Sequence, residues 1–136
     1  GTVIRSADAF GIDTVWLIGA TCDIYNPKTV RASMGSLFRV NVMQSGLDEF
    51  INEMKRMDIK TYATALSDTS KDIRDADLSN SAVIIGNEGK GISKEALKAS
   101  DGCLIIPMSG DAESLNAAVA SSIVMWEMKK DILCGK

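Results

Sequence analysis

A glycine-rich segment, Gly86-Asn87-Glu88-Gly89-Lys90-Gly91, has the composition of a ligand-binding turn. Three glycines in six residues permit a tight or left-handed backbone and let a ligand approach the main chain closely. The segment is not a phosphate-binding P-loop, because Ile92 follows Gly91 where that motif requires lysine. It is not a GxGxxG dinucleotide motif either, since Glu88 stands at the second glycine position. On these residues alone, a plain turn between a strand and a helix is an equal alternative.

Two predicted strands position this turn and a second polar loop. The apolar run from Ala82 to Ile85 leads into the turn, and Leu104 to Pro107 forms the next strand, which ends at proline because proline has no N–H for the ladder. The loop from Met108 to Ser114 then enters a helix that starts near Leu115, with Ser114 as its N-cap. Ligands of open α/β sheets bind outside the carboxyl ends of the strands, so both loops belong to one expected site.

The rest of the chain alternates predicted helices and strands. This order predicts a mostly parallel α/β sheet with helices on both faces. Further helices are expected at 2–10, 26–34, 46–57 and 115–133, further strands at 14–18, 38–42 and 59–65, and an irregular polar stretch at 68–80. The helical spacing predicts buried stripes at Leu47, Phe50, Ile51 and Met54 and at Leu115, Val119, Ile123 and Trp126.

Arginine and lysine residues near the N-terminus could interact with phosphates. Arg5 lies on a predicted helix that is otherwise rich in apolar residues, although a surface arginine with its stem packed on the core would look the same. The segment from Asn26 to Val40 contains Lys28, Arg31 and Arg39 and no acid. Such a segment could contact a nucleic-acid backbone, or it could be an ordinary solvated face.

Three motifs in order support a more specific interpretation. They are TVIRSADAFG at 2–11, GNEGKGIS at 86–93, and IPM at 106–108 followed by SLNAAVA at 114–120. Together they resemble the motifs of the SpoU/TrmH family, the RNA ribose 2′-O-methyltransferases of the SPOUT class. The resemblance covers nearly the whole chain, and three motifs in order are far more specific than one glycine-rich turn.

The resemblance implies a site, a cofactor and partners. It implies S-adenosylmethionine (AdoMet) as cofactor, with binding positions at Ala65, Gly86, Ile106, Met108, Ser114 and Leu115. It implies a catalytic group made of Arg5, Glu88, Ser114 and Asn116, in which Arg5 activates the ribose 2′-hydroxyl. It also implies a C-terminal deep trefoil knot, a homodimer, and an RNA partner, rRNA in preference to tRNA. We expect the RNA to approach across the basic residues Lys28, Arg31 and Arg39. An asparagine of the first motif would precede Gly1, so we expect residues 1–136 to be a methyltransferase domain that lacks its first strand and any N-terminal RNA-binding domain.

The composition of the chain excludes or disfavours several other classes of protein. At 136 residues and 46% hydrophobic content, the chain is one domain with a proper core rather than a disordered segment. No apolar run is long enough to span a bilayer, and we expect no metal site because histidine is absent and the three cysteines are far apart. These features fit the cytoplasm. A non-catalytic RNA-binding module with the same fold stays open as an alternative, and the failed glycine patterns disfavour a flavodoxin-like or Rossmann nucleotide binder.

Overall fold

The computed structural model describes residues 1–19, 23–87, 89–111 and 114–135. Five helices are present among them: α1 (Thr2–Phe10), α2 (Pro27–Ser33), α3 (Leu47–Arg56), α4 (Lys94–Ala99) and α5 (Ala117–Leu133). The strands in the same ranges are β1 (Thr14–Ile18), β2 (Asn41–Ser45), β3 (Lys60–Thr64), β4 (Lys71–Asp72), β5 (Ser81–Ile84) and β6 (Gly102–Ile105). Two short 3-10 turns, η1 (Ser36–Phe38) and η2 (Ile73–Asp75), complete the order.

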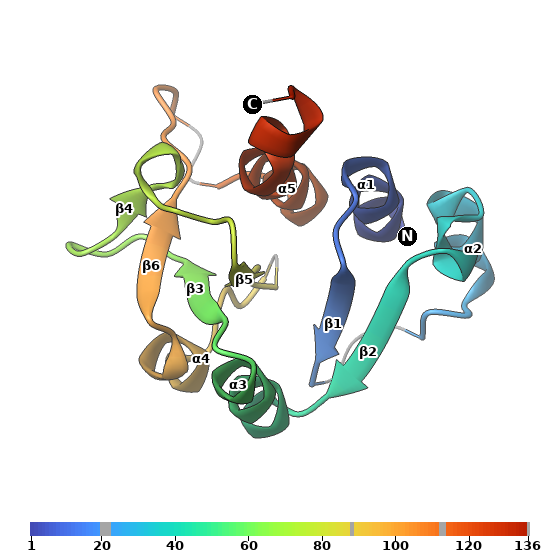
Figure 1. Cartoon of the computed structure of the whole chain (residues 1–136), viewed down its shortest axis with the longest axis horizontal. Helices are drawn as coiled ribbons and strands as arrows, with labels where there is room; N and C mark the ends of the chain where they lie inside the picture. Colours follow the sequence, from blue (N-terminus) through green and yellow to red (C-terminus); the bar gives the residue numbers. More distant parts are fainter. Residues whose placement is uncertain (20–22, 88, 112–113, 136) are drawn as a thin grey trace.

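The strands form two parallel sheets. One sheet pairs β1 with β2, and the other has the order β4-β6-β3-β5. Helices α1, α2 and α5 cover one face, whereas α3 and α4 cover the other (Figure 1). The expectation of a mostly parallel α/β fold with helices on both faces is therefore confirmed.

The two sheets share one hydrophobic core although their edges are not hydrogen-bonded to one another. Phe50, Ile51 and Met54 of α3 are buried, as their spacing predicts, and pack against side chains from both β1 and β5. The rings of Trp16 and Phe50 meet edge to face with their centroids 5.4 Å apart. A second core cluster, made of Ile73, Leu78 and Leu104, packs against Ile123 and Met128 of α5, so it lies on the face of the larger sheet that α5 covers.

The ends of the first two helices match the sequence signals. Gly11 ends α1 in the left-handed conformation with φ of 70°, which favours glycine. Asn26 caps α2 by accepting a hydrogen bond from the Lys28 N–H at 2.9 Å, and Pro27 occupies the first helical position. These signals are local, so the sequence alone specifies them.

Several predicted boundaries are wrong. The strand expected at 104–107 is β6, which spans Gly102–Ile105 and ends before Pro107. The stretch expected to be irregular at 68–80 contains β4, which pairs with β6. The strand expected at 38–42 begins at Asn41, because the chain first forms η1, in which the N–H of Phe38 bonds the Gly35 carbonyl. The last helix begins at Ala117 rather than near Leu115, and its N-cap is Asn116 rather than Ser114. Asn116 is the N-cap because its side chain accepts hydrogen bonds from two backbone N–H groups of the first turn.

The buried stripe predicted on α5 is also wrong in part. Val119 is 49% exposed and Trp126 is 42% exposed, whereas Ser121, Val124 and Met125 are buried. Ile123 does pack against the second core cluster. The helix packs against α1 on one side and against the second core cluster on the other. Its buried residues therefore lie on two sides of the helix rather than along one apolar stripe.

Candidate functional site

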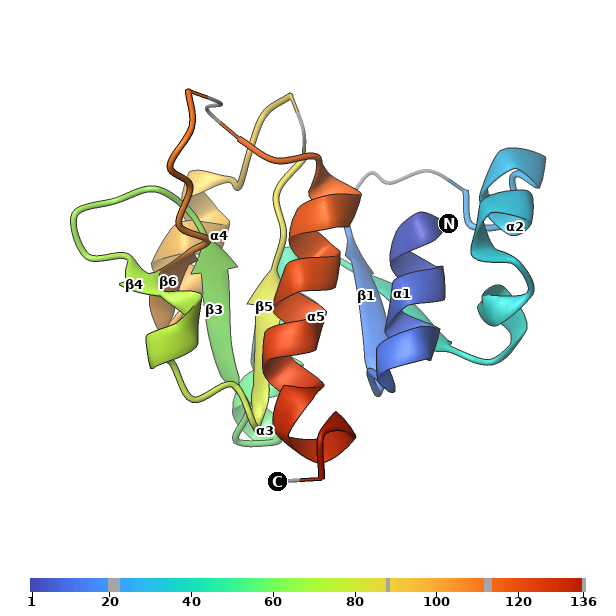
Figure 2. The same ribbon diagram turned by 90° about the horizontal axis from the view of Figure 1, so that it is seen from above.

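Three of the predicted cofactor residues follow neighbouring parallel strands. Ala65 follows β3, the residues up to Gly86 follow β5, and Ile106 follows β6. The order β6-β3-β5 places these three strand ends side by side, and the Ala65 N–H donates to the Leu104 carbonyl at 3.1 Å. Figure 2 shows the loops after β5 and β6 gathered at the end of the sheet where α5 begins. The fold thus brings these segments to one edge, which is where ligands of such sheets bind.

The glycine-rich turn is closed by hydrogen bonds of its own backbone. Asn87 and Gly91 exchange backbone hydrogen bonds of 3.2 and 2.8 Å. The Asn87 side-chain oxygen also accepts from the N–H groups of Gly89 and Lys90, at 2.8 and 3.3 Å. Because these four N–H groups already have partners within the turn, they are not free to cradle a phosphate. This geometry agrees with the absence of a P-loop pattern in the sequence.

Gly86 is required by the close packing of this turn. A Cβ added at Gly86 would lie 2.6 Å from the Gly91 carbonyl carbon and 2.8 Å from the Ile92 nitrogen. Real side chains do not tolerate such contacts with backbone, so any larger residue must displace the turn. Gly91 is needed for a different reason, since its φ of +65° lies in the left-handed region.

A cavity of about 220 Å³ lies beside the turn, between β1, β5 and the starts of α3 and α4. Its wall is largely apolar and includes Ile18, Leu47 and Ile84. Gly86 is the predicted cofactor residue that lines it; the others lie elsewhere along the same edge of the sheet. A larger hollow of about 410 Å³ between η2 and α5 is lined by none of the predicted site residues.

Arg5 projects from a helix that is fixed on two sides. The Arg5 side chain is exposed and has no hydrogen-bond or ion-pair partner among the residues that the structure describes. The neighbouring Ser6 hydroxyl lies 2.9 Å from that of Ser122 on α5. On the other side, Asp8 accepts hydrogen bonds from Ser36 and Arg39. Arg5 can therefore bind an anionic ligand, and the helix that carries it is held in place on both sides.

The three predicted RNA-binding cations differ in their surroundings. Arg39 donates from Nε and Nη2 to the same Asp8 carboxylate oxygen, at 2.9 and 2.6 Å, and the Ser36 hydroxyl donates to it at 2.7 Å. The Arg39 hydrogen bonds, and then that of Ser36, lower the pKa of Asp8 below its ordinary value. Lys28 and Arg31 are exposed and have no side-chain partner within the described parts of the chain. Arg39 thus stabilises the fold, whereas Lys28 and Arg31 are available to a ligand.

The start of α5 holds the predicted polar residues. Asn116 accepts hydrogen bonds from the N–H groups of Ala118 and Val119, at 2.9 and 3.4 Å, so it shapes the helix terminus. Ser114 is exposed, Leu115 is half-buried, and Met108 is exposed on the preceding loop. Glu88 lies outside the described residues. The structure records no hydrogen bond or ion pair between Arg5 and the other site residues that it describes.

The sequence analysis missed the role of Asn87. This side chain organises the glycine-rich turn through the two N–H groups that it binds. Asparagine followed two residues later by glycine is a signal for such a turn, and it could have been used. Elsewhere in the described residues, no group of His, Cys, Asp and Glu side chains is arranged to hold a metal ion. No helix in these ranges is long and apolar enough to cross a membrane.

Comparisons with known proteins identify relatives across the chain. Residues 1–126 match the SpoU rRNA Methylase family. The 23S rRNA (guanosine(2553)-2'-O)-methyltransferase RlmP of Bacillus subtilis (strain 168) is 39% identical over 129 residues, covering 95% of this chain and 52% of that protein. The tRNA (guanosine(18)-2'-O)-methyltransferase of Escherichia coli (strain K12) is 30% identical over 129 residues, covering 94% and 56%.

A solved structure is similar over the same region. The AdoMet-bound rRNA methyltransferase from Sinorhizobium meliloti superposes with a TM-score of 0.89 at 34% identity, covering 96% of this chain and 51% of that one. The chain therefore spans about half the length of the relatives that it matches.

Proposed function

Since this chain belongs to the SpoU rRNA Methylase family, we propose that it is the methyltransferase domain of an AdoMet-dependent enzyme that methylates ribose 2′-hydroxyls of RNA, rRNA in preference to tRNA. The observation that carries the proposal is the meeting, at one edge of the sheet, of three loops that bear predicted cofactor positions. These loops follow β3, β5 and β6, and the last of them leads to the start of α5.

The residues at this edge suit AdoMet. Ala65, Gly86, Ile106, Met108, Ser114 and Leu115 are the positions that would hold it, and none of them carries a charge that would repel a sulfonium. Four N–H groups in the described part of the turn already have partners within it, so a nucleotide triphosphate is a poor fit. When bound, AdoMet supplies an electrophilic methyl group. The close packing of Gly91 and Ile92 against Gly86 fixes the backbone of the turn beside this edge.

Arg5 is the residue that we assign to the reacting ribose. Methyl transfer requires alignment of the hydroxyl with the methyl group and loss of one proton from the hydroxyl. A guanidinium stays charged in proteins and binds phosphate through a fork of N–H donors. Arg5 would therefore hold the phosphate beside the target ribose and stabilise the alkoxide as the proton leaves. Its exposure, and the lack of a partner among the described residues, support this role. Glu88, Ser114 and Asn116 are the other residues proposed for the catalytic group.

Lys28 and Arg31 are the cations that we propose for the RNA backbone. They stand three residues apart on α2, so they lie on the same side of that helix. Arg39, also predicted from the sequence, would contribute chiefly by holding η1 on α1 through Asp8. Phosphate contacts fix the position of an RNA without specifying its sequence. Neutralising Arg31 should therefore weaken RNA binding broadly and reduce its salt dependence.

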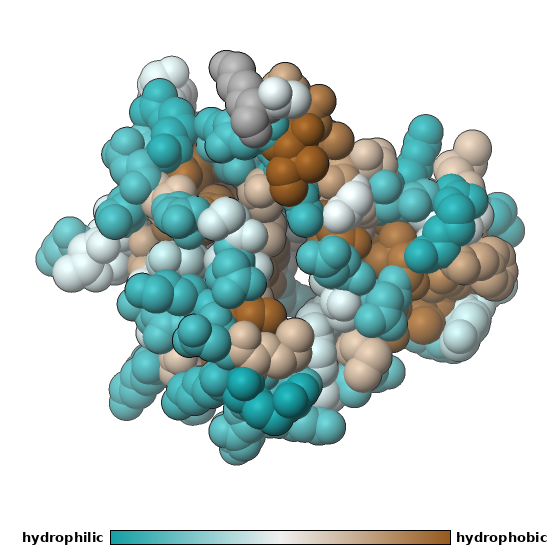
Figure 3. Space-filling model, viewed as in Figure 1, coloured by the Kyte–Doolittle hydropathy of each residue, from teal (hydrophilic) through white to brown (hydrophobic). Residues whose placement is uncertain are grey.

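A further strand is proposed between β1 and β5 in the intact protein. Among the described strands, β1 pairs with β2 alone and β5 pairs with β3 alone, so each has a free edge. Figure 3 shows a hollow between the two halves of the molecule. A strand that enters α1 would cross to β1 in the right-handed sense, as β1 crosses to β2 through α2. Because α1 and α2 cover the same face, that strand would lie on the side of β1 opposite β2, which is the side toward β5.

The homodimer and the trefoil knot, which the family resemblance implies, are also proposals. We propose a homodimer in which α1 and α5 meet the partner. The Phe10 and Trp126 rings join these helices with centroids 6.1 Å apart, and Trp126, Val119, Ile132 and Leu133 expose apolar surface along α5. The proposed trefoil knot would involve the loops after β5 and β6, which lie at the end of the sheet where α5 begins (Figure 2).

The proposal is tested by locating the transferred methyl group. The full-length protein is incubated with RNA and AdoMet carrying a tritiated methyl group, and the RNA is then treated with alkali. A ribose 2′-O-methyl group blocks cleavage of the adjacent phosphodiester, so the label should remain in alkali-resistant dinucleotides. Label in ordinary mononucleotides would indicate base methylation and overturn the assignment to ribose. AdoMet binding without any transfer would favour the non-catalytic RNA-binding module.

A further inference from the structure

An exposed aromatic ring stands on a fixed turn before α2. Tyr25 is 68% exposed. Its N–H donates to the Asp23 carboxylate at 2.9 Å, and the next N–H, that of Asn26, donates to the Asp23 carbonyl at 3.1 Å. Asn26 then caps α2. The backbone on both sides of the ring is therefore held, and a tyrosine with only two side-chain torsions loses little entropy when it binds a partner.

The surroundings of Tyr25 favour an anionic ligand. Residues 24–47 contain no acidic side chain, and Lys28 and Arg31 follow Tyr25 on α2 without side-chain partners in the described ranges. Asp23 is the nearest acid in the sequence, and its carboxylate already accepts the Tyr25 N–H. The whole chain has a net charge of −3, so this positive region contrasts with the rest of the protein.

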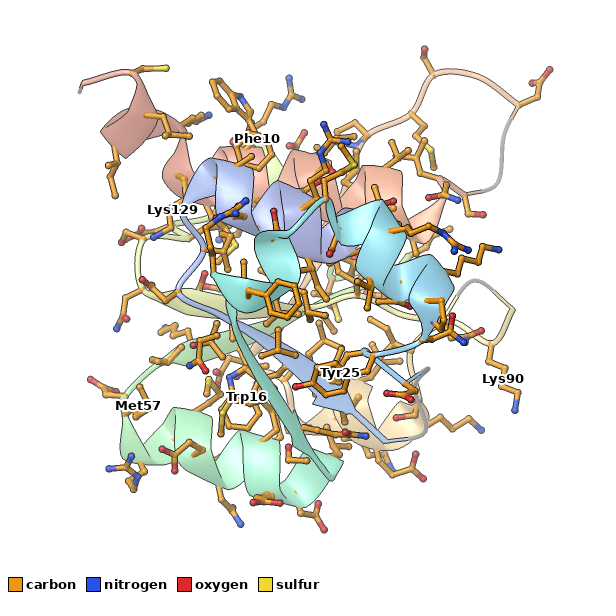
Figure 4. The ribbon with its side chains drawn as sticks, turned by 90° about the vertical axis from the view of Figure 1, so that its right-hand side faces the viewer. Phe10, Trp16, Tyr25, Met57, Lys90 and Lys129 are labelled. Atoms are coloured by element: carbon orange, nitrogen blue, oxygen red, sulfur yellow. The ribbon has the colours of Figure 1, made fainter. Side chains whose placement is uncertain are left out.

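Tyr25 also lies in a connection that starts at the functional edge of the molecule. The turn that carries it belongs to the connection after β1, at the carboxyl end of a parallel strand. Figure 4 shows Tyr25 below α2, near the middle of the face in view, whereas Lys90 of the glycine-rich turn extends from one end of the molecule. Met57, at the end of α3, lies at the opposite end. A ligand that covers this face can meet Tyr25 together with Lys28 and Arg31 of α2.

We propose that Tyr25 stacks on an unpaired base of the RNA substrate while Lys28 and Arg31 bind the adjacent phosphates. This inference rests on the proposed function and narrows it to RNA whose bases are unstacked, in a single strand or a loop. A duplex offers its phosphates to the two cations but keeps its base faces stacked inside, so it leaves the ring of Tyr25 without a partner. A single strand offers both features, and stacking on an aromatic ring tolerates any base.

The test compares single-stranded and duplex RNA on the full-length protein. The probes are a labelled strand of about ten uridylates and its duplex with oligoadenylate, with affinity measured by fluorescence anisotropy. Tyr25→Ala should weaken binding of the single strand by roughly 5- to 150-fold and leave duplex binding unchanged. Tyr25→Phe keeps the π-face and should bind as the wild type does. Met57→Ala, a truncation of an exposed side chain at the other end of the molecule, is the matched control and should change neither probe.

Several results would overturn the inference. Equal losses for single strand and duplex would mean that Tyr25 acts through the fold of the α2 region. No loss for either probe would remove the ring from the RNA surface. Dissociation of a dimer by Tyr25→Ala in sedimentation would assign the ring to a second copy of the chain. The methyl-transfer assay on the wild type is read separately, so failure of the proposed enzyme activity is distinguishable from failure of the stacking contact.

Discussion

Replacing Gly86 with alanine perturbs the candidate cofactor site at one backbone position. The added Cβ would lie 2.6 Å from the Gly91 carbonyl carbon, whereas ordinary contact begins at 3.4 Å. The difference, about 0.8 Å, must be taken up by backbone, because the atoms met are the Gly91 carbonyl carbon and the Ile92 nitrogen as well as one side-chain atom of Ile92. The turn must therefore open by most of an ångström next to the proposed AdoMet position.

This displacement is large on the scale of ligand recognition. A misplacement of about 1 Å in a positioned group can cost about 10²-fold in rate. We expect Gly86→Ala to lower AdoMet affinity at least about tenfold and methyl transfer by a similar or larger factor. The same turn supplies two comparisons. The Cβ of alanine at position 91 would make no close contact, but Gly91→Ala forces alanine to adopt a φ of +65°. This strain should cost about 1–2 kcal/mol of folding stability.

Gly89→Ala is the matched control within the turn. The Cβ of alanine at that position would meet only the Asn87 side-chain oxygen, at 3.5 Å, so binding should change by less than about threefold. The assay is calorimetric titration of AdoMet into each full-length variant, after circular dichroism has shown that each is folded. The steric argument is refuted if folded Gly86→Ala binds AdoMet as tightly as Gly89→Ala does.

Three other substitutions test the fold that positions the site. Leu104→Ala empties a fully buried position in the second core cluster and should lower the free energy of unfolding by about 2–5 kcal/mol in urea titrations. Asn26→Ala removes the cap of α2 and should cost about 1 kcal/mol by the same measurement, with a circular dichroism signal that still shows a folded protein. Hydrogen bonds from Arg74 lower the pKa of Asp72 to about 2, so the stability it contributes is present above its ordinary value of 3.8 and is lost as pH falls toward 2. Asp72→Asn should flatten this acid dependence in urea midpoints measured across that range; an unchanged slope would show that the ion pair does not contribute to stability.

Elements with local signals could be predicted from the sequence, because their ends depend on nearby residues. Gly11 ends α1 through its own left-handed conformation, and Asn26 with Pro27 starts α2. The apolar face of α3 packs on the sheet as its spacing predicts. In each case the tertiary structure agrees with the local preference.

The errors occur where distant segments decide the outcome. The Ser36 hydroxyl binds Asp8 on α1, so the chain turns at η1 before β2 can begin. The last helix contacts α1 as well as the core cluster, so Val119 and Trp126 are exposed although they fit a helical stripe. Neither contact is encoded in the periodicity of its own segment.

The sequence predicts residues for the candidate site but not their geometry. Motif resemblance supplied positions such as Gly86 and Ile106, yet the strand order that brings them together is a tertiary property. The pairing of Arg39 with Asp8 separates it from Lys28 and Arg31, and no spacing in the sequence distinguishes the three. Tyr25 belongs to none of the three sequence motifs. It is a candidate RNA contact because the structure shows its side chain exposed on a hydrogen-bonded turn.

Methyl transfer by an Arg5→Ala variant tests the central claim most directly. Tritiated methyl incorporation into RNA is measured with the full-length protein, and AdoMet binding is titrated in parallel. Arg5→Ala should lower transfer by roughly two or more orders of magnitude with AdoMet affinity nearly intact, because Arg5 acts on the ribose and its phosphate. Arg56→Ala removes an exposed arginine that is paired with Glu53 on α3, and it should transfer at the wild-type rate. Wild-type transfer by Arg5→Ala would contradict the account and leave Arg5 as an ordinary surface residue.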